Sequence, residues 1–274
     1  MKKLISLILI FLFVLNSAGC TSQKEYLCVD FLDVGNADCI VIRTENRTTV
    51  IDTATSISSD IIFEYLNEKE IDRIDILIIT HFDKDHVGSA SKIINNIKVD
   101  RVYQTYKNSG AKSQYYKRYL KSLKNNKTDV YTLSEPKKMF QDDAILSIYP
   151  PKSDGYITKE SNNSSLVVTL EYGKFSFFFG GDIEKVRIAE ILSDGTEKYD
   201  VLKVPHHGYY EDNTGEFISE ISPTFSVITT TSLSPPSPQT VMELYRIGSK
   251  VYFTDNGRVE MTTDGNKLSV KQNK

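Results

Sequence analysis

Two histidines and two aspartates stand within six positions of one short segment, THFDKDHVGS at residues 80–89. The chain has only four histidines, and the other two form the adjacent pair His206 and His207. Imidazole nitrogens and carboxylate oxygens together are ligands of zinc, manganese and iron. The alternative is a charge-rich surface turn. We expect the segment to bind divalent metal through the four residues His81, Asp83, Asp85 and His86.

Four such groups are more than one catalytic ion needs beside an open position for water, so we expect two ions. His81 and Asp83 would hold one, and Asp85 and His86 the other. An apolar strand, IDILIIT, runs up to His81, and a helix is expected from near His86. The segment therefore lies at the carboxyl edge of a strand, where α/β folds place their sites.

A further carboxylate follows a second buried strand. The segment KFSFFFGGD breaks at two glycines and ends at Asp182. A carboxylate at this edge can bridge two ions, so we expect Asp182 between them. The alternative is that it caps the helix expected from Ile183.

The second histidine cluster also ends a strand, in the segment VLKVPHHG. Adjacent side chains of a strand point in opposite directions, so one of the pair faces the site unless the turn at Gly208 rotates the other. We assign His206 and His207 to catalysis together with Asp85, and we count His206 among the metal ligands. Which histidine binds metal stays open, and a structural pair is the alternative.

Short strands, tight turns and interleaved helices must position these side chains. The chain has 274 residues, of which 40% are hydrophobic, enough to bury a full core. Many strands are hairpin-linked, as at Asn256-Gly257 and Asp264-Gly265, and helices separate others. This order favours the α/β class with two sheets and helices outside them, a four-layer αββα sandwich, over a single parallel sheet.

The pattern H-x-D-x-D-H before a glycine-started helix resembles the metallo-β-lactamase superfamily signature, with aspartate at its middle position. The segments DFLDVGNADCIVI, VIDTA, NNSSLVVTLEYG, FFGGD and LKVPHHG narrow the resemblance. In this order they are similar to the extracytoplasmic hydrolase domain of the competence protein ComEC and its stand-alone relatives. The likeness runs from about Tyr26 to Val270. It implies the αββα fold, a metal-dependent hydrolase, and nuclease or phosphodiesterase activity on DNA.

The resemblance also implies roles for residues around the ions. Asp182 matches the aspartate that bridges two ions, and a histidine placed like the 206–207 pair protonates the leaving oxygen in related tRNA-processing endonucleases. Five further residues are expected behind the ligands. Asp52 matches the first motif and would orient a ligand histidine. Asp33 and Asp38 flank the first turn and match the family's DVGxxD, where turn capping is the alternative. Asn163 and Ser165 fall at the position of the third motif.

Three departures from the family pattern affect the second ion. The family's late His-Pro has its nearest match here in Pro235-Pro236, and no histidine follows His207. The family's serine after HHG is Tyr209, and Ala54 stands where a glycine is usual. We therefore expect one or two divalent ions, zinc or manganese.

The first nineteen residues have the pattern of a signal peptide. Lys2 and Lys3 precede an apolar run that is too short to cross a bilayer, and small residues lead to Cys20. This resembles a lipoprotein cleavage site, so we expect a lipid on Cys20, a tether over 20–25, and the hydrolase domain over 26–274. The protein is then anchored to the bacterial membrane outside the cytoplasm, with plain secretion as the alternative.

Residues 107–140 differ in charge from the rest of the chain. They contain nine basic and two acidic residues, while the whole chain has a net charge of −3. Tyrosines are interleaved with the lysines, which suits a polyanionic strand such as DNA. The alternative is a solvated helix on a basic surface insertion.

Two other functions remain open beside a DNA phosphodiesterase. One is a metal-dependent hydrolase of another ester, a lactone or a β-lactam. The other is a lipoprotein that keeps the fold as a non-catalytic binding module. The sequence identifies no protein partner.

Overall fold

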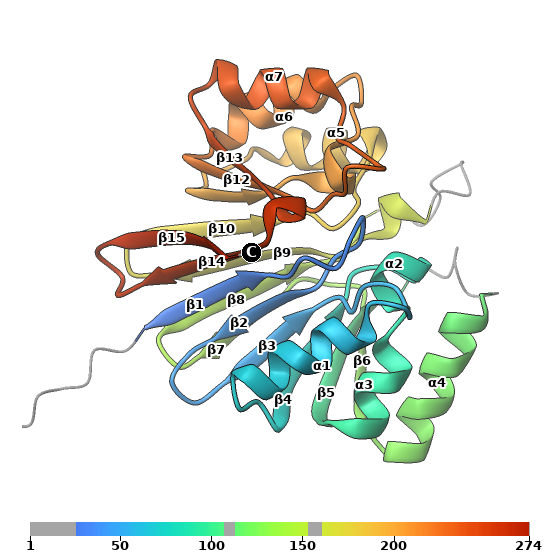
Figure 1. Cartoon of the computed structure of the whole chain (residues 1–274). Coiled ribbons are helices and arrows are strands. Elements are labelled where there is room, and N and C mark those ends of the chain that lie inside the picture. The colour runs from blue at the N-terminus through green and yellow to red at the C-terminus, as the bar shows by residue number, and fades with distance from the viewer. Residues whose placement is uncertain (1–25, 107–112, 153–160, 274) are drawn as a thin grey trace, which may run out of the picture.

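The computed structural model describes residues 26–106, 113–152 and 161–273. Two mixed β-sheets face each other, and helices cover the outer side of each sheet (Figure 1). The predicted α/β class and the four-layer αββα arrangement are therefore confirmed.

The first sheet has eight strands in the order β15-β14-β1-β2-β3-β4-β5-β6. They are β1 (Leu27–Phe31), β2 (Ile40–Arg43), β3 (Thr48–Ile51), β4 (Arg73–Ile79), β5 (Lys98–Thr105), β6 (Asp129–Leu133), β14 (Arg258–Thr263) and β15 (Leu268–Asn273). Its helices are α1 (Ser59–Glu68), α2 (Lys84–Val87), α3 (Ala90–Asn96) and α4 (Gln114–Asn126).

The second sheet has seven strands in the order β13-β12-β11-β10-β9-β8-β7. They are β7 (Lys137–Gln141), β8 (Ala144–Tyr149), β9 (Val167–Tyr172), β10 (Phe175–Phe179), β11 (Val201–Lys203), β12 (Phe225–Ile228) and β13 (Lys250–Phe253). Its helices are α5 (Lys185–Asp194), α6 (Thr214–Ile221) and α7 (Pro238–Arg246), and short 3₁₀ turns are η1 (Asn162–Ser164), η2 (Pro205–Gly208) and η3 (Thr254–Asn256).

Alternating side chains hold the four layers together. In β4, Ile76 and Ile78 enter the core between the sheets, while Leu77 and Ile79 pack under the helices of the first sheet. In β10, Phe177 and Phe179 face the same central core and Phe178 packs on the other side. Because successive side chains of a strand point to opposite faces, strands buried on both faces must be apolar throughout.

Each sheet contains a parallel half whose strands are connected through helices. β3, β4, β5 and β6 run parallel in the first sheet, and β10, β11, β12 and β13 run parallel in the second. A parallel connection through a helix brings the chain back to the same edge, so the carboxyl ends of these strands gather at one edge of their sheet.

The basic segment 107–140, expected as a basic insertion, contributes to both sheets. Its described part forms α4 and the edge strands β6 and β7, so it carries the chain from the first sheet to the second. Tyr119 is fully buried against the first sheet, and its hydroxyl donates to Gln104 Oε1 at 2.6 Å. Tyr116 packs on Phe82. The Tyr119 ring is therefore part of the core, and the partly buried Tyr116 ring packs against it.

The expected signal peptide, the lipid anchor at Cys20 and the tether lie outside the described residues. Within the described ranges, no helix has both the length and the apolar character needed to cross a membrane.

Candidate metal centre

The predicted ligands stand at the carboxyl ends of parallel strands in both sheets. Asp52 follows β3 and His81 comes just after β4, while Asp182 comes just after β10 and His207 follows β11. The backbone N–H of Leu166, ahead of β9, donates to Thr80 O at 3.0 Å and joins the two edges there. Residues far apart in the chain therefore meet where the two sheets face each other.

Four side chains form the densest cluster of metal-ligating groups. Asp85, His86, Asp182 and His207 each offer one ligand atom, and these atoms lie within 4.8 Å of one another. Asp182 Oδ2 lies 3.1 Å from His86 Nε2 and 3.4 Å from His207 Nε2. All but Asp85 are buried.

Fixed partners behind both histidines turn their Nε2 atoms toward Asp182. His86 Nδ1 lies 2.7 Å from Asp52 Oδ2, and the other Asp52 oxygen accepts from the Thr80 N–H at 2.8 Å. His207 Nδ1 lies 3.0 Å from the carbonyl oxygen of Thr229. In the neutral ring the Nδ1–H then points away from the cluster and Nε2 presents a lone pair, the arrangement of metal-ligating histidine.

His81 supplies a third Nε2 beside this cluster. Its ring centroid lies 4.0 Å from that of His86, and its Nδ1 lies 3.2 Å from Ser165 Oγ. The Nε2 atoms of the three histidines and Asp182 Oδ1 are buried without a hydrogen bond to any described residue. Buried polar atoms are nearly always partnered, so convergent orphaned nitrogens and oxygen fit a divalent cation.

Asp83 stands at the rim and is the most exposed of the predicted ligands. Its carboxylate is 39% exposed, and its Oδ2 lies 4.0 Å from His81 Nε2. The four-residue cluster around Asp182 is thus more complete than the pair His81 and Asp83. This difference favours one well-formed cation site with a second, weaker position beside it.

The structure separates the two adjacent histidines. His207 joins the cluster, whereas His206 lies outside it and groups instead with Glu184 and Glu211. His206 Nε2 lies 3.2 Å from Asn162 Nδ2. The expectation of His206 as a ligand beside Asp182 therefore does not match this geometry, and His207 takes that place.

The backbone at the two histidines has an unusual conformation, which changes the direction of both side chains after the strand ends. His206 and His207 have φ of 46° and 52°, a left-handed conformation that is costly for residues with a side chain. The His206 N–H donates to Gly181 O at 3.2 Å, and the Ser237 N–H donates to Gly208 O at 3.0 Å. The sequence left open whether this turn rotates the second histidine, and in the structure it rotates both.

Lys203 is a functional candidate that the sequence reasoning missed. The side chain is fully buried at the end of β11 and forms an ion pair with Asp38. Its Nζ donates to Gly181 O at 3.0 Å and lies 3.6 Å from Asp182 Oδ1. A lysine inside the otherwise apolar strand before the histidine pair is the signal that could have revealed it.

The remaining expected residues have different roles. Asp38 is buried and accepts from Thr229 Oγ1 at 2.7 Å, so it supports the cluster from behind. Ser165 Oγ accepts from the Asp182 N–H at 3.2 Å. Asn163 Oδ1 accepts from the N–H groups of Glu184 and Arg187 and so caps the start of α5. Asp33 lies in the turn after β1, where burial raises its pKa and the Gly35 N–H opposes that shift.

Charges in the cluster hold each other in place when no cation is bound. Burial is the largest single influence and lowers the pKa of His207, but the carboxylates of Asp182, Asp85 and Asp38 together outweigh it and raise the pKa to about 9. Burial likewise opposes the charge of His86, yet Asp182 and Asp52 raise its pKa well above the ordinary value. Burial lowers the pKa of His81 and keeps that ring neutral. Protons on His86 and His207 therefore compete with a cation.

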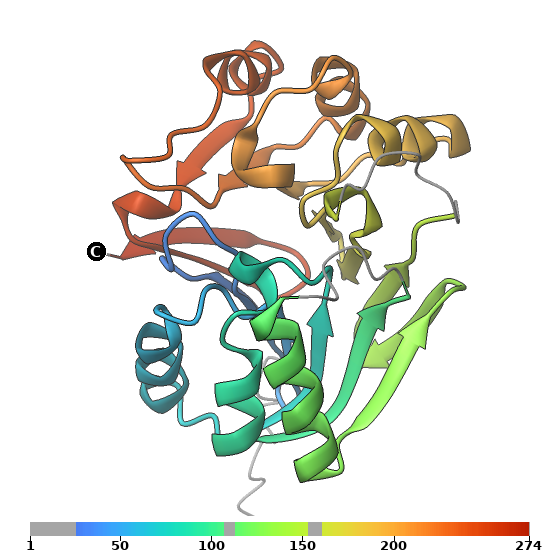
Figure 2. The ribbon, with the colours of Figure 1, turned by 90° about the vertical axis from the view of Figure 1, so that its right-hand side faces the viewer.

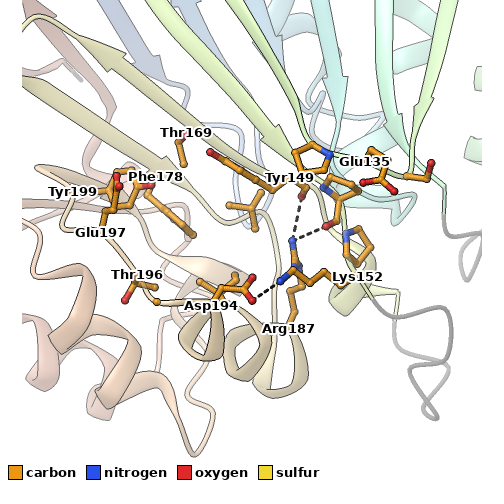
Figure 3. A pocket seen from close by; sticks show the side chains of 17 residues that line it. Glu135, Tyr149, Lys152, Thr169, Phe178, Arg187, Asp194, Thr196, Glu197 and Tyr199 are labelled. Atoms are coloured by element: carbon orange, nitrogen blue, oxygen red, sulfur yellow. Dashed lines mark hydrogen bonds and ion pairs between the residues drawn. The ribbon is translucent and has the colours of Figure 1, made fainter.

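A separate cavity of about 600 Å³ lies on the outer side of the second sheet, between its strands and α5 (Figure 3). The buried Arg187 borders it and donates to the carbonyl oxygens of Tyr149 and Pro150. Lys152 and Asp194 form an ion pair across it. None of the metal-ligand candidates lines this cavity, so it is not part of the metal centre.

The chain is similar in sequence to known proteins. A family model described as the metallo-beta-lactamase superfamily matches residues 32–229. The chain is 26% identical over 255 residues to ComE operon protein 3 of Bacillus subtilis, covering 85% of this chain and 32% of that protein. It is 26% identical over 254 residues to Recombination protein 2 of Haemophilus influenzae, covering 89% of this chain and 30% of that protein. The chain thus spans about a third of the length of these relatives.

A solved structure shows the same fold. The metallo-beta-lactamase fold protein YhfI of Bacillus subtilis is 8% identical, with a TM-score of 0.58, and the match covers 90% of this chain and 100% of that one. Together with the family match, this confirms the resemblance inferred from the motifs.

Proposed function

The chain belongs to the metallo-β-lactamase superfamily, and from this premise we propose that it is a metal-dependent phosphodiesterase that cleaves DNA. The observation that carries the proposal is the convergence of Asp85, His86, Asp182 and His207 on one small volume. Superfamily membership supports hydrolysis. The choice of DNA as the substrate and of a phosphodiester as the bond cleaved goes beyond family membership.

The chain's residues have distinct tasks in this reaction. Asp85, His86, Asp182 and His207 would hold one ion, and His81 with Asp83 a second one beside it. Such ions, when bound, activate water as a nucleophile at neutral pH and neutralise charge on a phosphate. Asp52 Oδ2 lies 2.7 Å from His86 Nδ1 and holds the ring in its orientation. Lys203 Nζ lies 3.6 Å from Asp182 Oδ1 and holds that carboxylate through the oxygen that does not face the histidines.

His206 is suited to a different step. It stands at the rim, where its side chain is 24% exposed, and its Nδ1 lies 3.4 Å from Glu184 Oε1. A ring in this position can donate a proton to the leaving oxygen of a substrate bound at the cluster. We therefore assign leaving-group protonation to His206 and metal binding to His207.

Two observations support DNA as the substrate. One of the relatives is named Recombination protein 2, and the similarity to both relatives extends over most of this chain. The exposed side of α4 carries several lysines that suit a polyanion. The N-terminal pattern ending at Cys20 further supports a lipid-anchored protein that works outside the cytoplasm.

Metal content measured together with plasmid nicking tests the proposal. We expect about one to two equivalents of zinc or manganese in the purified protein and DNA cleavage that a chelator abolishes. Asp85→Ala removes a ligand, so cleavage should fall by more than the roughly 10- to 100-fold typical of lost supporting residues. Asp33→Ala is the matched control because Asp33 lies in a turn outside the cluster, and it should cleave normally.

Three results would contradict the proposal. Undiminished cleavage by Asp85→Ala would remove the site assignment. Turnover of nitrocefin or a lactone without any DNA cleavage would instead establish the other hydrolase. Less than half an equivalent of metal with no turnover would establish a non-catalytic module.

A further inference from the structure

We propose that the outer face of α4 binds the phosphate backbone of a single DNA strand and leads that strand to the metal centre. This inference rests on the proposed function and identifies a surface outside the metal centre to which the substrate binds. It depends on three properties of α4, namely its uncompensated charge, the direction of its basic side chains and its contact with the metal-binding loop.

The charge of α4 has no counterpart nearby. The helix contains no acidic residue, and its basic side chains are exposed. Within the described ranges, their only side-chain hydrogen bond joins Arg118 to Gln114, and no carboxylate pairs with any of them. We call this set the α4 stripe: Lys117, Arg118, Lys121, Lys124 and the C-cap residue Lys127.

Three of these lysines point directly away from the protein body. Tyr119, Ser122 and Leu123 are the buried side of α4. Lys117, Lys121 and Lys124 follow each other at intervals of four and three residues, so they share the opposite side of the helix. At 1.5 Å per residue they span roughly 10 Å, enough for successive phosphates of one strand.

The stripe begins beside the metal-binding loop. Tyr116 in the first turn of α4 packs on Phe82 with ring centroids 4.5 Å apart, and Phe82 stands between His81 and Asp83. Lys117 is the next residue along the helix. Figure 2 shows α4 beside α3 on the outer side of the first sheet. A strand bound along the stripe therefore reaches the ligands by passing the amino end of α4.

Two acidic residues, Glu184 and Glu211, group with His206 at the rim of the metal centre. A polyanion is repelled from that rim and attracted to the α4 side, so the approach has a direction.

Binding of a fluorescent 20-nucleotide single strand to the chelated full-length protein tests this inference, because no cleavage occurs without divalent cations. For a single strand, each phosphate contact contributes about 0.7 to the slope of log affinity against log salt concentration. The triple variant Lys117→Gln, Lys121→Gln, Lys124→Gln should therefore lower the slope by about 2. Its affinity at 0.1 M salt should fall by about 100-fold.

The matched control is Lys174→Gln, Lys267→Gln, Lys271→Gln, which removes the same charge from exposed positions far from α4 in the chain. It should bind DNA as the wild type does, and circular dichroism should show both variants folded. Unchanged affinity and slope in the α4 variant would overturn the inference. Loss of binding to phosphatidylglycerol vesicles with DNA binding intact would also overturn it, in favour of a membrane surface.

The two proposals fail in different ways. A wild-type protein that cleaves no DNA with any metal, yet binds it through α4, would refute the phosphodiesterase and support the stripe. Cleavage with binding independent of α4 would refute only the stripe.

Discussion

Charge is used in opposite ways in the metal centre and in the α4 stripe. In the metal centre most charged groups, such as Asp38, Asp182 and Lys203, are buried and have a fixed neighbour of the other sign, as Lys203 has Asp38. In the stripe five cations are exposed, and no described carboxylate pairs with them. The comparison teaches that a buried charge acts through one defined partner, whereas exposed charges act as a sum over weak contacts.

Two lysines make the difference concrete. Lys203 is 0% exposed and its position is defined by Asp38, Gly181 and Asp182. Lys121 is exposed on α4 with no described partner. The same change at both positions should therefore have very different consequences for stability.

The largest effect is expected from Lys203→Met. Methionine fills a similar volume but leaves Asp38 and Asp182 buried without their cation, and breaking a buried pair costs about 3–5 kcal/mol. Urea unfolding of the chelated protein measures this change, with Lys121→Met as the matched control. A loss below about 1 kcal/mol for Lys203→Met would show that the two regions do not differ in this way.

The free energy of unfolding of the metal-free protein is expected to depend on pH, by somewhat less than the loss expected for Lys203→Met. The pKa of His207 is raised from 6.5 to about 9, so its proton stabilises the fold fully below pH 6.5, and this contribution is lost as the pH rises through 9. His86 changes in the same direction. At about 1.4 kcal/mol per pKa unit, roughly 3 kcal/mol is lost.

Thermal unfolding at pH 6.5 and pH 9 in chelator measures this loss, and His207→Gln should remove most of it. Added zinc or manganese should abolish the decline, since a cation replaces the protons. Stability of the chelated protein that rises from pH 6.5 to 9 would contradict the assignment of these charges.

The smallest effect is expected from a single change in the stripe. Lys121→Gln removes one exposed charge, so the free energy of unfolding should change by less than about 0.5 kcal/mol. Affinity for the single strand at 0.1 M salt should fall by only about fivefold, one contact's share of the salt slope. A loss as large as that of the triple variant would mean that Lys121 acts as a defined contact, like Lys203.

Much of the fold and several site residues were predictable from local patterns. The continuous apolar run in strands such as IDILIIT is a direct consequence of burial on both faces, and it identified the buried strands of both sheets. Polar residues that end such strands must come to an edge. His81, Asp182 and His207 were recognisable because each follows an apolar run.

Other features depended on contacts that no local pattern encodes. The basic segment was expected as an insertion, yet α4 buries Tyr119 and the segment supplies an edge strand to each sheet. A charged helix with a narrow apolar side looks solvated until its neighbours are known. Asp33 and Asp38 have equivalent positions around one turn, and only Asp38 reaches Lys203.

The sequence alone determined the αββα order of elements and the presence of ligating groups at strand ends, because side-chain periodicity and turn residues act over a few positions. The tertiary structure decided which groups meet. It brought His207 to Asp182 and left His206 outside that cluster, and it placed Lys203 between two aspartates more than a hundred residues apart in the chain. Such pairings depend on how two sheets face each other, and that relation is a property of the packed core as a whole.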